Sequence, residues 1–303
     1  MSTYDIVLLT DSRYVAPKKP GWYEQNVLTE DKLVAIALEN IGLKVWRTNW
    51  DNPDFDWAET RFALFRTTWD YFDRFTEFSI WLEKASQCTH FINPVEMIKW
   101  NINKFYLCDL EDKGINIPPT VFIHTGDTRS LQELAQIHNW PEIILKPAVS
   151  GAARHTYRFT QESIHKHEDI YTTLIQNEDM LLQEFQHNIF EKGEVAFMVF
   201  GGKFSHAVLK KGKPGDFRVQ DDFGGTVHHY SPSIEEILFA EKVVASCDPP
   251  PVYARVDVIW DNDGNPSLSE LELIEPELWF RLHKPSATAM ANAIAHYCIQ
   301  SEK

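Results

Sequence analysis

Two adjacent, largely apolar runs near the C-terminal end carry an unusual density of charge. The segment 253–276 reads YARVDVIWDNDGNPSLSELELIEP and contains Arg255, Asp257, Glu270, Glu272 and Glu275. Carboxylates placed side by side repel one another and are costly to desolvate, so they persist where a divalent cation neutralises them. Their hard oxygen ligands suit Mg²⁺, with Mn²⁺ as the alternative ion. The other interpretation is a pair of solvated edge strands with scattered acids.

The same segment predicts a hairpin. Two alternating runs, Val252–Trp260 and Ser267–Ile274, flank a stretch of Asp, Asn, Gly and Pro that is typical of a tight turn. Side chains alternate between the two faces of a strand. Arg255 and Asp257 therefore lie on one face of the first strand, and Glu270 and Glu272 lie on one face of the second. If these faces coincide, three carboxylates and a guanidinium converge. The predicted metal ligands are Asp257, Glu270 and Glu272.

Two further regions favour an anionic ligand. Lys146 stands at the end of an apolar strand, Ile143–Pro147, and small residues including Ser150 and Gly151 follow it. A loop of small residues lets backbone amides approach a phosphate, with the lysine beside it as a point charge. A basic, glycine-rich segment, 210–225, reads as a mobile loop.

Composition limits the partners and the compartment. The chain has 303 residues and a formal net charge of −15, which argues against nucleic acid or an anionic membrane as the main partner. The four cysteines are far apart and form no CxxC pair, which favours a reducing cytoplasm. A cleavable signal and an apolar stretch long enough to span a membrane are both missing from the sequence, so we expect a cytoplasmic protein.

The first part of the chain predicts an open α/β sheet. An apolar run, Ile6–Thr10, is followed by a helical pattern over Glu30–Asn40 and a second strand. Such sheets bind ligands at the ends of their strands, which makes the polar residues there candidates for a small polar substrate. Arg66 suits a substrate carboxylate because its fork makes two parallel hydrogen bonds, and an arginine simply paired with a nearby acid is the alternative. The candidates are Ser12, Arg66 and Thr67, with Arg281 as a second anchor.

The predicted strands and helices divide the chain into three units. We predict an N-terminal α/β substrate-binding domain over 1–93, a central subdomain over 94–185 and a C-terminal subdomain with the metal site over 186–303. The predicted helices include 101–113, 131–139 with Ser130 as its cap, 234–246 and 287–300. A long hairpin, 194–209, is expected to turn at Gly201-Gly202.

In this order, the features resemble the ATP-grasp superfamily, and specifically its carboxylate–amine ligases such as D-alanine–D-alanine ligase and prokaryotic glutathione synthetase. The match covers roughly residues 103–276. Asn103-Lys104 is similar to the first phosphate-contacting lysine of that family, and Lys146 to the second. The run Val149-Ser150-Gly151-Ala152 resembles the small-residue loop over the phosphates, although it is shorter and poorer in glycine.

The resemblance implies further roles for individual residues. Leu182-Gln183-Glu184-Phe185 is similar to the hinge that holds adenine, and Glu194 to the acid that binds the ribose. The closing pattern of the family is Arg-x-Asp followed by Glu-x-Asn, and Glu272 stands here in place of the Asn. The runs 66–70 and 271–276 also resemble a subgroup that includes the O-ureido-serine cyclo-ligase type. The implied fold is α/β, with α+β in the grasp part: an ATP-grasp behind a Rossmann-like substrate domain.

The implied activity is an ATP-dependent ligase. A small, amino-acid-like carboxylate becomes an acyl-phosphate, which an amine attacks to give a C–N bond with release of ADP and phosphate. The residues expected to assist are Arg255, Arg218 and Lys210. The cofactors are ATP and Mg²⁺. A nucleotide-binding regulatory protein of the synapsin kind and a small-molecule kinase on the same scaffold are the alternatives, and a homodimer is left open.

Overall fold

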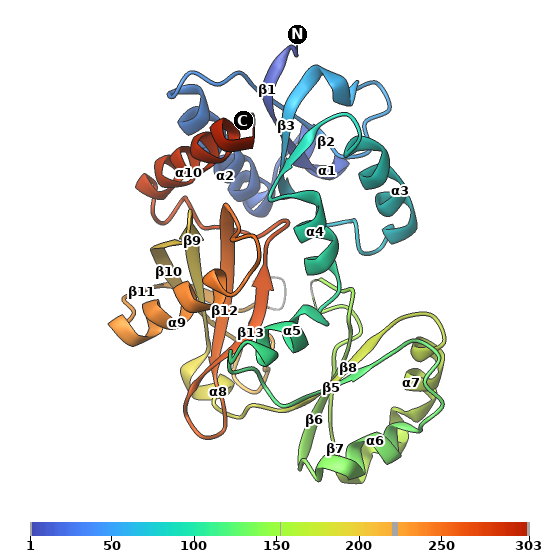
Figure 1. Cartoon of the computed structure of the whole chain (residues 1–303). Coiled ribbons are helices and arrows are strands. Elements are labelled where there is room, and N and C mark those ends of the chain that lie inside the picture. Colours follow the sequence, from blue (N-terminus) through green and yellow to red (C-terminus); the bar gives the residue numbers. More distant parts are fainter. Residues whose placement is uncertain (1, 152, 220–223, 302–303) are drawn as a thin grey trace.

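Three β-sheets organise the chain in the computed structural model, which describes residues 2–151, 153–219 and 224–301. Figure 1 shows the N-terminal sheet at the top, the C-terminal sheet below it and the central sheet to its side. The helices cover the sheets in each unit, which is the mixed α/β and α+β class that the sequence predicted. Within the described ranges, none of the helices has both the length and the apolar character that crossing a bilayer requires.

The N-terminal sheet is parallel, with the strand order β2-β1-β3-β4. Its third strand is buried over almost its whole length because helices cover both faces. This arrangement confirms the predicted βαβ opening, with a helix that begins eight residues earlier than expected. The strands are β1 (Tyr4–Thr10), β2 (Val45–Asn49), β3 (Thr60–Thr67) and β4 (His90–Ile92); the helices are α1 (Ser12–Val15), α2 (Trp22–Glu39), the 3₁₀ turn Trp57–Glu59 and α3 (Phe75–Ala85).

The central sheet is antiparallel, with the order β5-β8-β6-β7. Its helix α6 begins at the predicted cap: the Ser130 hydroxyl accepts from the backbone N–H of Glu133, whose carboxylate accepts in return from the Ser130 N–H. The strands are β5 (Thr120–Ile123), β6 (Glu142–Pro147), β7 (Tyr157–Thr160) and β8 (Met180–Glu184); the helices are α6 (Leu131–His138), the 3₁₀ turn Gln161–Lys166 and α7 (Glu168–Ile175).

The C-terminal sheet contains both predicted hairpins, in the order β11-β10-β9-β12-β13. One turns at Gly201-Gly202 and the other carries the acids. The strands are β9 (Glu194–Phe200), β10 (Lys203–Lys211), β11 (Thr226–Tyr230), β12 (Tyr253–Trp260) and β13 (Pro266–Glu272); the helices are α8 (Ile189–Lys192) and α9 (Ile234–Ala245). Part of the predicted basic loop belongs to β10, and its residues 220–223 lie outside the described residues.

The predicted helix over 101–113 is two helices, α4 (Val95–Ile102) and α5 (Tyr106–Asp112). The break lies at Asn103, whose backbone is extended (φ −95°, ψ 119°) and whose side-chain oxygen accepts from the N–H of Phe105. An asparagine side chain that bonds its own backbone competes with the helix, which accounts for the interruption. The break matters for function because it presents Lys104, whose backbone N–H donates to the carbonyl of Ala148 at 2.9 Å.

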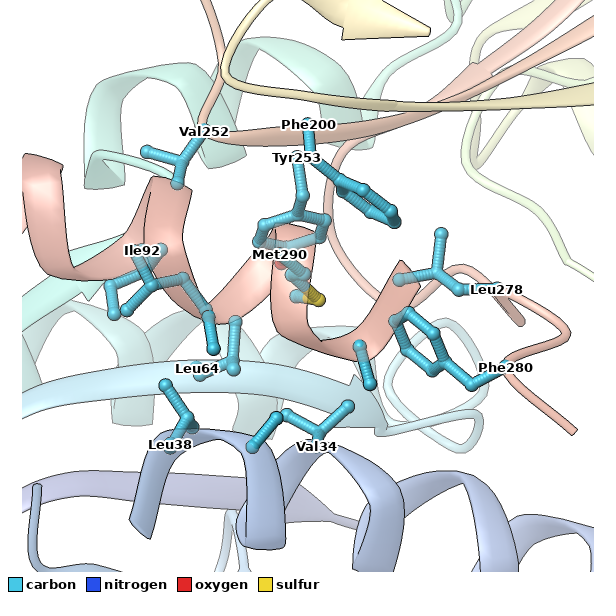
Figure 2. Packing of buried hydrophobic residues seen from close by; sticks show 14 of the residues in the cluster. Val34, Leu38, Leu64, Ile92, Phe200, Val252, Tyr253, Leu278, Phe280 and Met290 are labelled. Carbon is cyan, nitrogen blue, oxygen red and sulfur yellow. The ribbon is translucent and has the colours of Figure 1, made fainter. Parts of the chain in front are cut away.

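The last helix, α10 (Pro285–Ser301), returns to the N-terminal unit and packs beside α2. Figure 2 shows the shared core, in which Leu38 and Leu64 of the N-terminal unit meet Met290 of α10 and Tyr253 of β12. About 25 cal/mol is gained for each Å² of apolar surface buried in such a core. The first and last thirds of the chain are therefore joined through one hydrophobic cluster, while the predicted domain boundaries stay a prediction.

Candidate active site

One cavity of about 580 Å³ is lined by side chains from all three units. Its polar lining is dense in charge of both signs. The cationic side chains are Arg13, Lys104, Lys146, Lys210, Arg218 and Arg255, and the carboxylates are Glu184, Glu194, Asp257, Glu270, Glu272, Glu275 and Glu277. Six cations and seven acids nearly balance, so a bound triphosphate, which carries several negative charges, would need an additional cation.

The acidic hairpin forms one wall of this cavity. The strand register places Arg255 opposite Glu272 and Asp257 opposite Glu270, so the four side chains share one face, as predicted. Arg255 donates to both oxygens of Asp257, at 2.9 Å from Nε and 2.7 Å from Nη2, and also pairs with Glu272. Asp257 is only 2% exposed, so the alternative of solvated edge strands does not hold.

Three lysines reach the cavity from three separate segments of the chain. Lys104 lies 3.0 Å from a carboxylate oxygen of Glu270, and Lys210 lies 3.0 Å from one of Asp257 and also pairs with Glu194. Lys146, on β6, makes no ion pair within the described residues. It is the lysine of the three whose charge is uncommitted, which suits it to an incoming phosphate.

Burial and charge move the pKa values of these groups in different directions. Burial lowers the pKa of Lys146 to about 8. Burial also disfavours the ionised form of Asp257 and Glu270, but the neighbouring cations outweigh it and hold both pKa values below their ordinary range. Burial, with the other acids around it, raises the pKa of Glu272 to about 8 in spite of Arg255. The protein's own cations therefore do not fully offset the repulsion between Glu272 and the neighbouring carboxylates.

A glycine fixes the approach of the two strands that carry Glu194 and Lys210. Gly193 has a φ of 75°, and a Cβ at this position would lie 2.4 Å from the carbonyl oxygen of Lys210. Only glycine tolerates this conformation and this distance. Glu194 and Lys210 face each other in the register of β9 and β10, and Glu194 also accepts from the hydroxyl of Ser269 at 3.0 Å.

The predicted phosphate loop and adenine hinge both line the cavity. Ser150 accepts a hydrogen bond at its carbonyl from the Lys104 ammonium, at 2.5 Å, and Gly151 lies against the ring of Phe72. In the hinge, the backbone N–H of Glu184 donates to the carbonyl of Pro119, just before β5, and that of Phe185 to the carbonyl of Glu142 on β6. The hinge residues that line the cavity are Gln183, Glu184, Phe185 and Gln186.

The basic loop meets the hinge across the cavity. Phe217 packs edge-on against Phe185, with ring centroids 5.9 Å apart. The neighbouring Arg218 lines the cavity and donates from Nη2 to Asp216 at 2.8 Å. The loop thus covers the side of the cavity where the hinge lies. The predicted mobility of this loop stays a prediction.

The four predicted substrate residues do not line this cavity. Arg66 is 1% exposed and lies 3.4 Å from Asp31, with its guanidinium over the ring of Phe280. Thr67 shares a 2.6 Å hydrogen bond with Thr10. Ser12 begins α1 and is exposed, and Arg281 pairs with Glu30 and Glu277. Their role in binding substrate stays a prediction.

Aromatic residues of the N-terminal unit form the facing wall, which the sequence did not indicate. Arg13 is the cation on this wall. Trp69 and Trp279 also line the cavity. The one available signal was the position of Trp69 just after the end of a strand. The aromatic lining comprises Tyr14, Tyr23, Trp69, Tyr71, Phe72, Phe185, Phe217 and Trp279.

The hairpin offers carboxylate oxygens, the type of donor atom that a magnesium ion prefers. Within the described residues, no three acidic, histidine or cysteine side chains are grouped as a metal site requires, because the acids contact Arg255, Lys104 and Lys210 instead. The hard carboxylate oxygens and the raised pKa of Glu272 nevertheless call for a further cation. The residues present thus fit the ion. It would neutralise part of the charge of acids that are paired here with Arg255, Lys104 and Lys210.

Comparisons with known proteins agree with this geometry. A family model described as the N-terminal domain of the D-cycloserine synthetase DcsG matches residues 6–93. The cycloserine biosynthesis protein DcsG of Streptomyces lavendulae is 26% identical over 283 residues, which cover 86% of this chain and 90% of that protein.

Solved structures extend the likeness to the whole fold. The crystal structure of D-cycloserine synthetase DcsG has a TM-score of 0.83 at 23% identity and covers 97% of this chain and 99% of its own. The ATP-grasp ligase PsnB, solved with a precursor peptide and AMPPNP, has a TM-score of 0.61 at 15% identity, with 98% of each chain covered. D-alanine–D-alanine ligase of Bacillus anthracis, solved with ATP, has a TM-score of 0.64 at 14% identity, again with 98% of each chain covered.

The structural likeness establishes the fold, and the match to the Streptomyces protein spans most of both chains. The N-terminal unit, which is the least similar to the general ligases by sequence motif, is the part that the family model matches. The chain therefore has the ATP-grasp fold of these ligases.

Proposed function

We propose that this protein is a ligase that joins a small, amino-acid-like carboxylate to an amine through an acyl-phosphate, with release of ADP and phosphate. The observation that carries the proposal is the single cavity in which Lys104, Lys146 and Lys210 face Asp257 and the two glutamates of β13. Phosphoryl transfer depends mainly on positioning and charge neutralisation, and this lining offers both.

The nucleotide would lie between the central and C-terminal sheets. The hinge residues Gln183–Phe185 would contact the base, Glu194 the ribose, and Lys104 and Lys146 the phosphates. Support comes from their position in one lining and from the uncommitted charge of Lys146. When bound, magnesium supplies charge neutralisation at the phosphates, and Asp257, Glu270 and Glu272 would hold it.

The protein's own side chains have distinct tasks in the transfer. Arg255 is fixed by two hydrogen bonds to Asp257, so its guanidinium is oriented before substrate binds. It would stabilise the negative charge on the transferring phosphoryl group and then on the tetrahedral intermediate. Lys210 keeps its charge although it is buried, since Asp257 and Glu194 raise its pKa. Arg218 and the loop around it would exclude water from the acyl-phosphate.

The substrates are proposed from the relatives. One relative is named for cycloserine biosynthesis and another for joining two D-alanines, so both act on small amino acids or their derivatives. The N-terminal wall of the cavity, with Tyr23, Trp69 and Arg13, lies where such a substrate could face the phosphate-binding lysines. The product is then an amide, a dipeptide or a ring.

The test is a screen for ADP release. The purified chain is mixed with ATP, Mg²⁺ and pairs of amino acids, small carboxylates and ureido derivatives, and each product is identified by mass. We expect release of ADP and phosphate only when both a carboxylate and an amine are supplied. The two groups can belong to one substrate or to two separate substrates. ADP release without an acceptor, or a phosphorylated product in place of a C–N bond, would favour the kinase alternative. Nucleotide binding with no release at all would favour the regulatory one.

A further inference from the structure

Glu275 differs from the other acids that follow the hairpin. Of the four acids between 270 and 277, Glu270 pairs with Lys104, Glu272 with Arg255 and Glu277 with Arg281. Glu275 makes no salt bridge within the described residues, although it lines the cavity. It also lies beyond the end of β13 and on the side of the N-terminal unit. Lys104 is near enough to act on this carboxylate but pairs with Glu270, so Glu275 has no ion-pair partner of its own in the described part of the chain.

Aromatic residues of the N-terminal unit lie beside Glu275. The Tyr71 hydroxyl hydrogen-bonds to its side chain, and the Trp69 indole N–H donates to its backbone carbonyl at 2.9 Å. Trp69 in turn packs against Tyr14, with ring centroids 5.8 Å apart, and against Tyr23, at 6.1 Å. All four aromatic residues line the cavity. The contacts fix Glu275 and Trp69 relative to each other, so the subsite is built before a ligand arrives.

A carboxylate among aromatic rings attracts one kind of group. Ring faces attract cations, and the carboxylate adds a direct charge contact. An ammonium group satisfies both at once. Burial raises the pKa of Glu275 to about 7 in spite of Lys104 and the Tyr71 hydroxyl, which expresses the cost of keeping the buried carboxylate charged. A bound cation removes that cost.

We propose that Glu275, Trp69, Tyr14 and Tyr23 form a subsite for a protonated amino group of the substrate. The inference rests on the proposed function and narrows its substrate class. A protonated amine is no nucleophile, so this group serves recognition and differs from the amine that forms the new bond. The substrate therefore carries a free ammonium group in addition to its reacting groups. Glu275 binds that group and takes no part in holding the metal.

The experiment compares each amino acid with its N-acetyl derivative, which lacks the cation. ADP release is measured with ATP and Mg²⁺ over a panel of D- and L-amino acids, their ureido derivatives and the acetylated counterparts. We expect acetylation to raise KM at least tenfold. With the best substrate, Glu275→Gln is expected to raise its KM at least tenfold, with kcat within threefold and the Mg²⁺ requirement unchanged. An unchanged KM, or a raised Mg²⁺ requirement with the same substrate KM, overturns the proposal.

A second variant and a control keep the test independent of folding. Tyr23 is half-buried on α2, so Tyr23→Leu removes one ring at a site that tolerates it, and a twofold to fivefold rise in KM is expected for the cationic substrate alone. Glu162→Gln, exposed on the central unit, should leave KM unchanged. An equal rise in KM for acetylated substrates in Tyr23→Leu contradicts the cation subsite.

Failure of the proposed function can be told from failure of the subsite. If no substrate of the panel releases ADP, calorimetry with AMPPNP, Mg²⁺ and the same amino acids measures binding alone. Amino acids that bind, with loss of binding on acetylation and in Glu275→Gln, support the subsite although the ligase reaction fails. Equal binding of both forms, or no binding of any amino acid, rejects it.

Discussion

The acidic hairpin and the edge of the N-terminal sheet were both predicted to bind ligands, and the structure uses them differently. On β12 and β13, Arg255, Asp257 and Glu270 line the cavity as the strand period requires. At the carboxyl end of β3, Arg66 and Thr67 make contacts within the N-terminal unit and do not line it. In both regions, polar residues on a strand or at its end were predicted to line a binding site. The hairpin residues line the cavity, whereas Arg66 and Thr67 do not.

The difference lies in what fixes the side chain. In an antiparallel hairpin, a short turn sets the register, and the register sets which residues share a face. At the end of a parallel strand, the direction of a long side chain depends on the elements packed around it. Arg66 finds Asp31 on α2 and Phe280 from the far end of the chain, neither of which is near it in sequence.

The largest effect is expected at Asp257. Asp257→Asn keeps the shape of the side chain but removes the charge that holds Arg255 and Lys210, so we expect kcat/KM for ADP release to fall about 1,000-fold. Circular dichroism should show an intact fold. Asp263→Asn, in the exposed turn of the same hairpin, is the matched control. Retained turnover in Asp257→Asn would refute both the metal assignment and the central role of this hairpin.

Lys146→Ala should have the next largest effect. The variant removes the cavity lysine that has no carboxylate partner in the described residues, so a bound phosphate loses its contact with that charge. We expect kcat/KM to fall about 100-fold. Lys84→Ala, exposed on α3, is the control. Calorimetry with AMPPNP separates weaker nucleotide binding from slower chemistry. Unchanged affinity and turnover would remove the central sheet from the nucleotide site.

The depressed pKa of Lys146 predicts a pH dependence. With a pKa of about 8 in the free enzyme, the side chain is charged below pH 8 and neutral above it. Affinity for AMPPNP should be level below that point and fall above it by up to about tenfold for each pH unit. Titration between pH 6.5 and 9.5 measures this. Lys146→Arg keeps the charge throughout, so a break near pH 8 that persists in this variant would assign it to another group.

Arg66→Met tests the other region and should change catalysis least. Because Arg66 is buried beside Asp31, its loss is expected to lower the free energy of unfolding by about 3 kcal/mol, at the low end for a broken buried pair since Arg47 still contacts Asp31. KM for the substrate should stay within twofold. Denaturant unfolding and steady-state kinetics measure the two effects. A tenfold rise in KM with unchanged stability would restore Arg66 as a substrate residue.

Local chemistry explains which elements were predictable. The Ser130 cap, the turn at Gly201-Gly202 and the acidic hairpin each depend on residues within a few positions of one another. The break between α4 and α5 was missed, since the Asn103 side chain that helps to stabilise it also binds Asp179, 76 residues away. The aromatic wall was missed for the same reason: Tyr23, Trp69 and Glu275 belong to distant segments.

The sequence by itself determined the ATP-grasp fold, the face shared by the hairpin acids, and the choice of Lys104 and Lys146, which line the cavity and which we propose as phosphate ligands. These follow from local periodicity, turn composition and the order of short motifs. Only the tertiary structure decided that Arg66 turns away, that Lys146 is left uncommitted and that Glu275 stands among aromatic rings. A salt bridge or its absence depends on which distant side chains the fold brings within a few ångströms, and no local pattern encodes that.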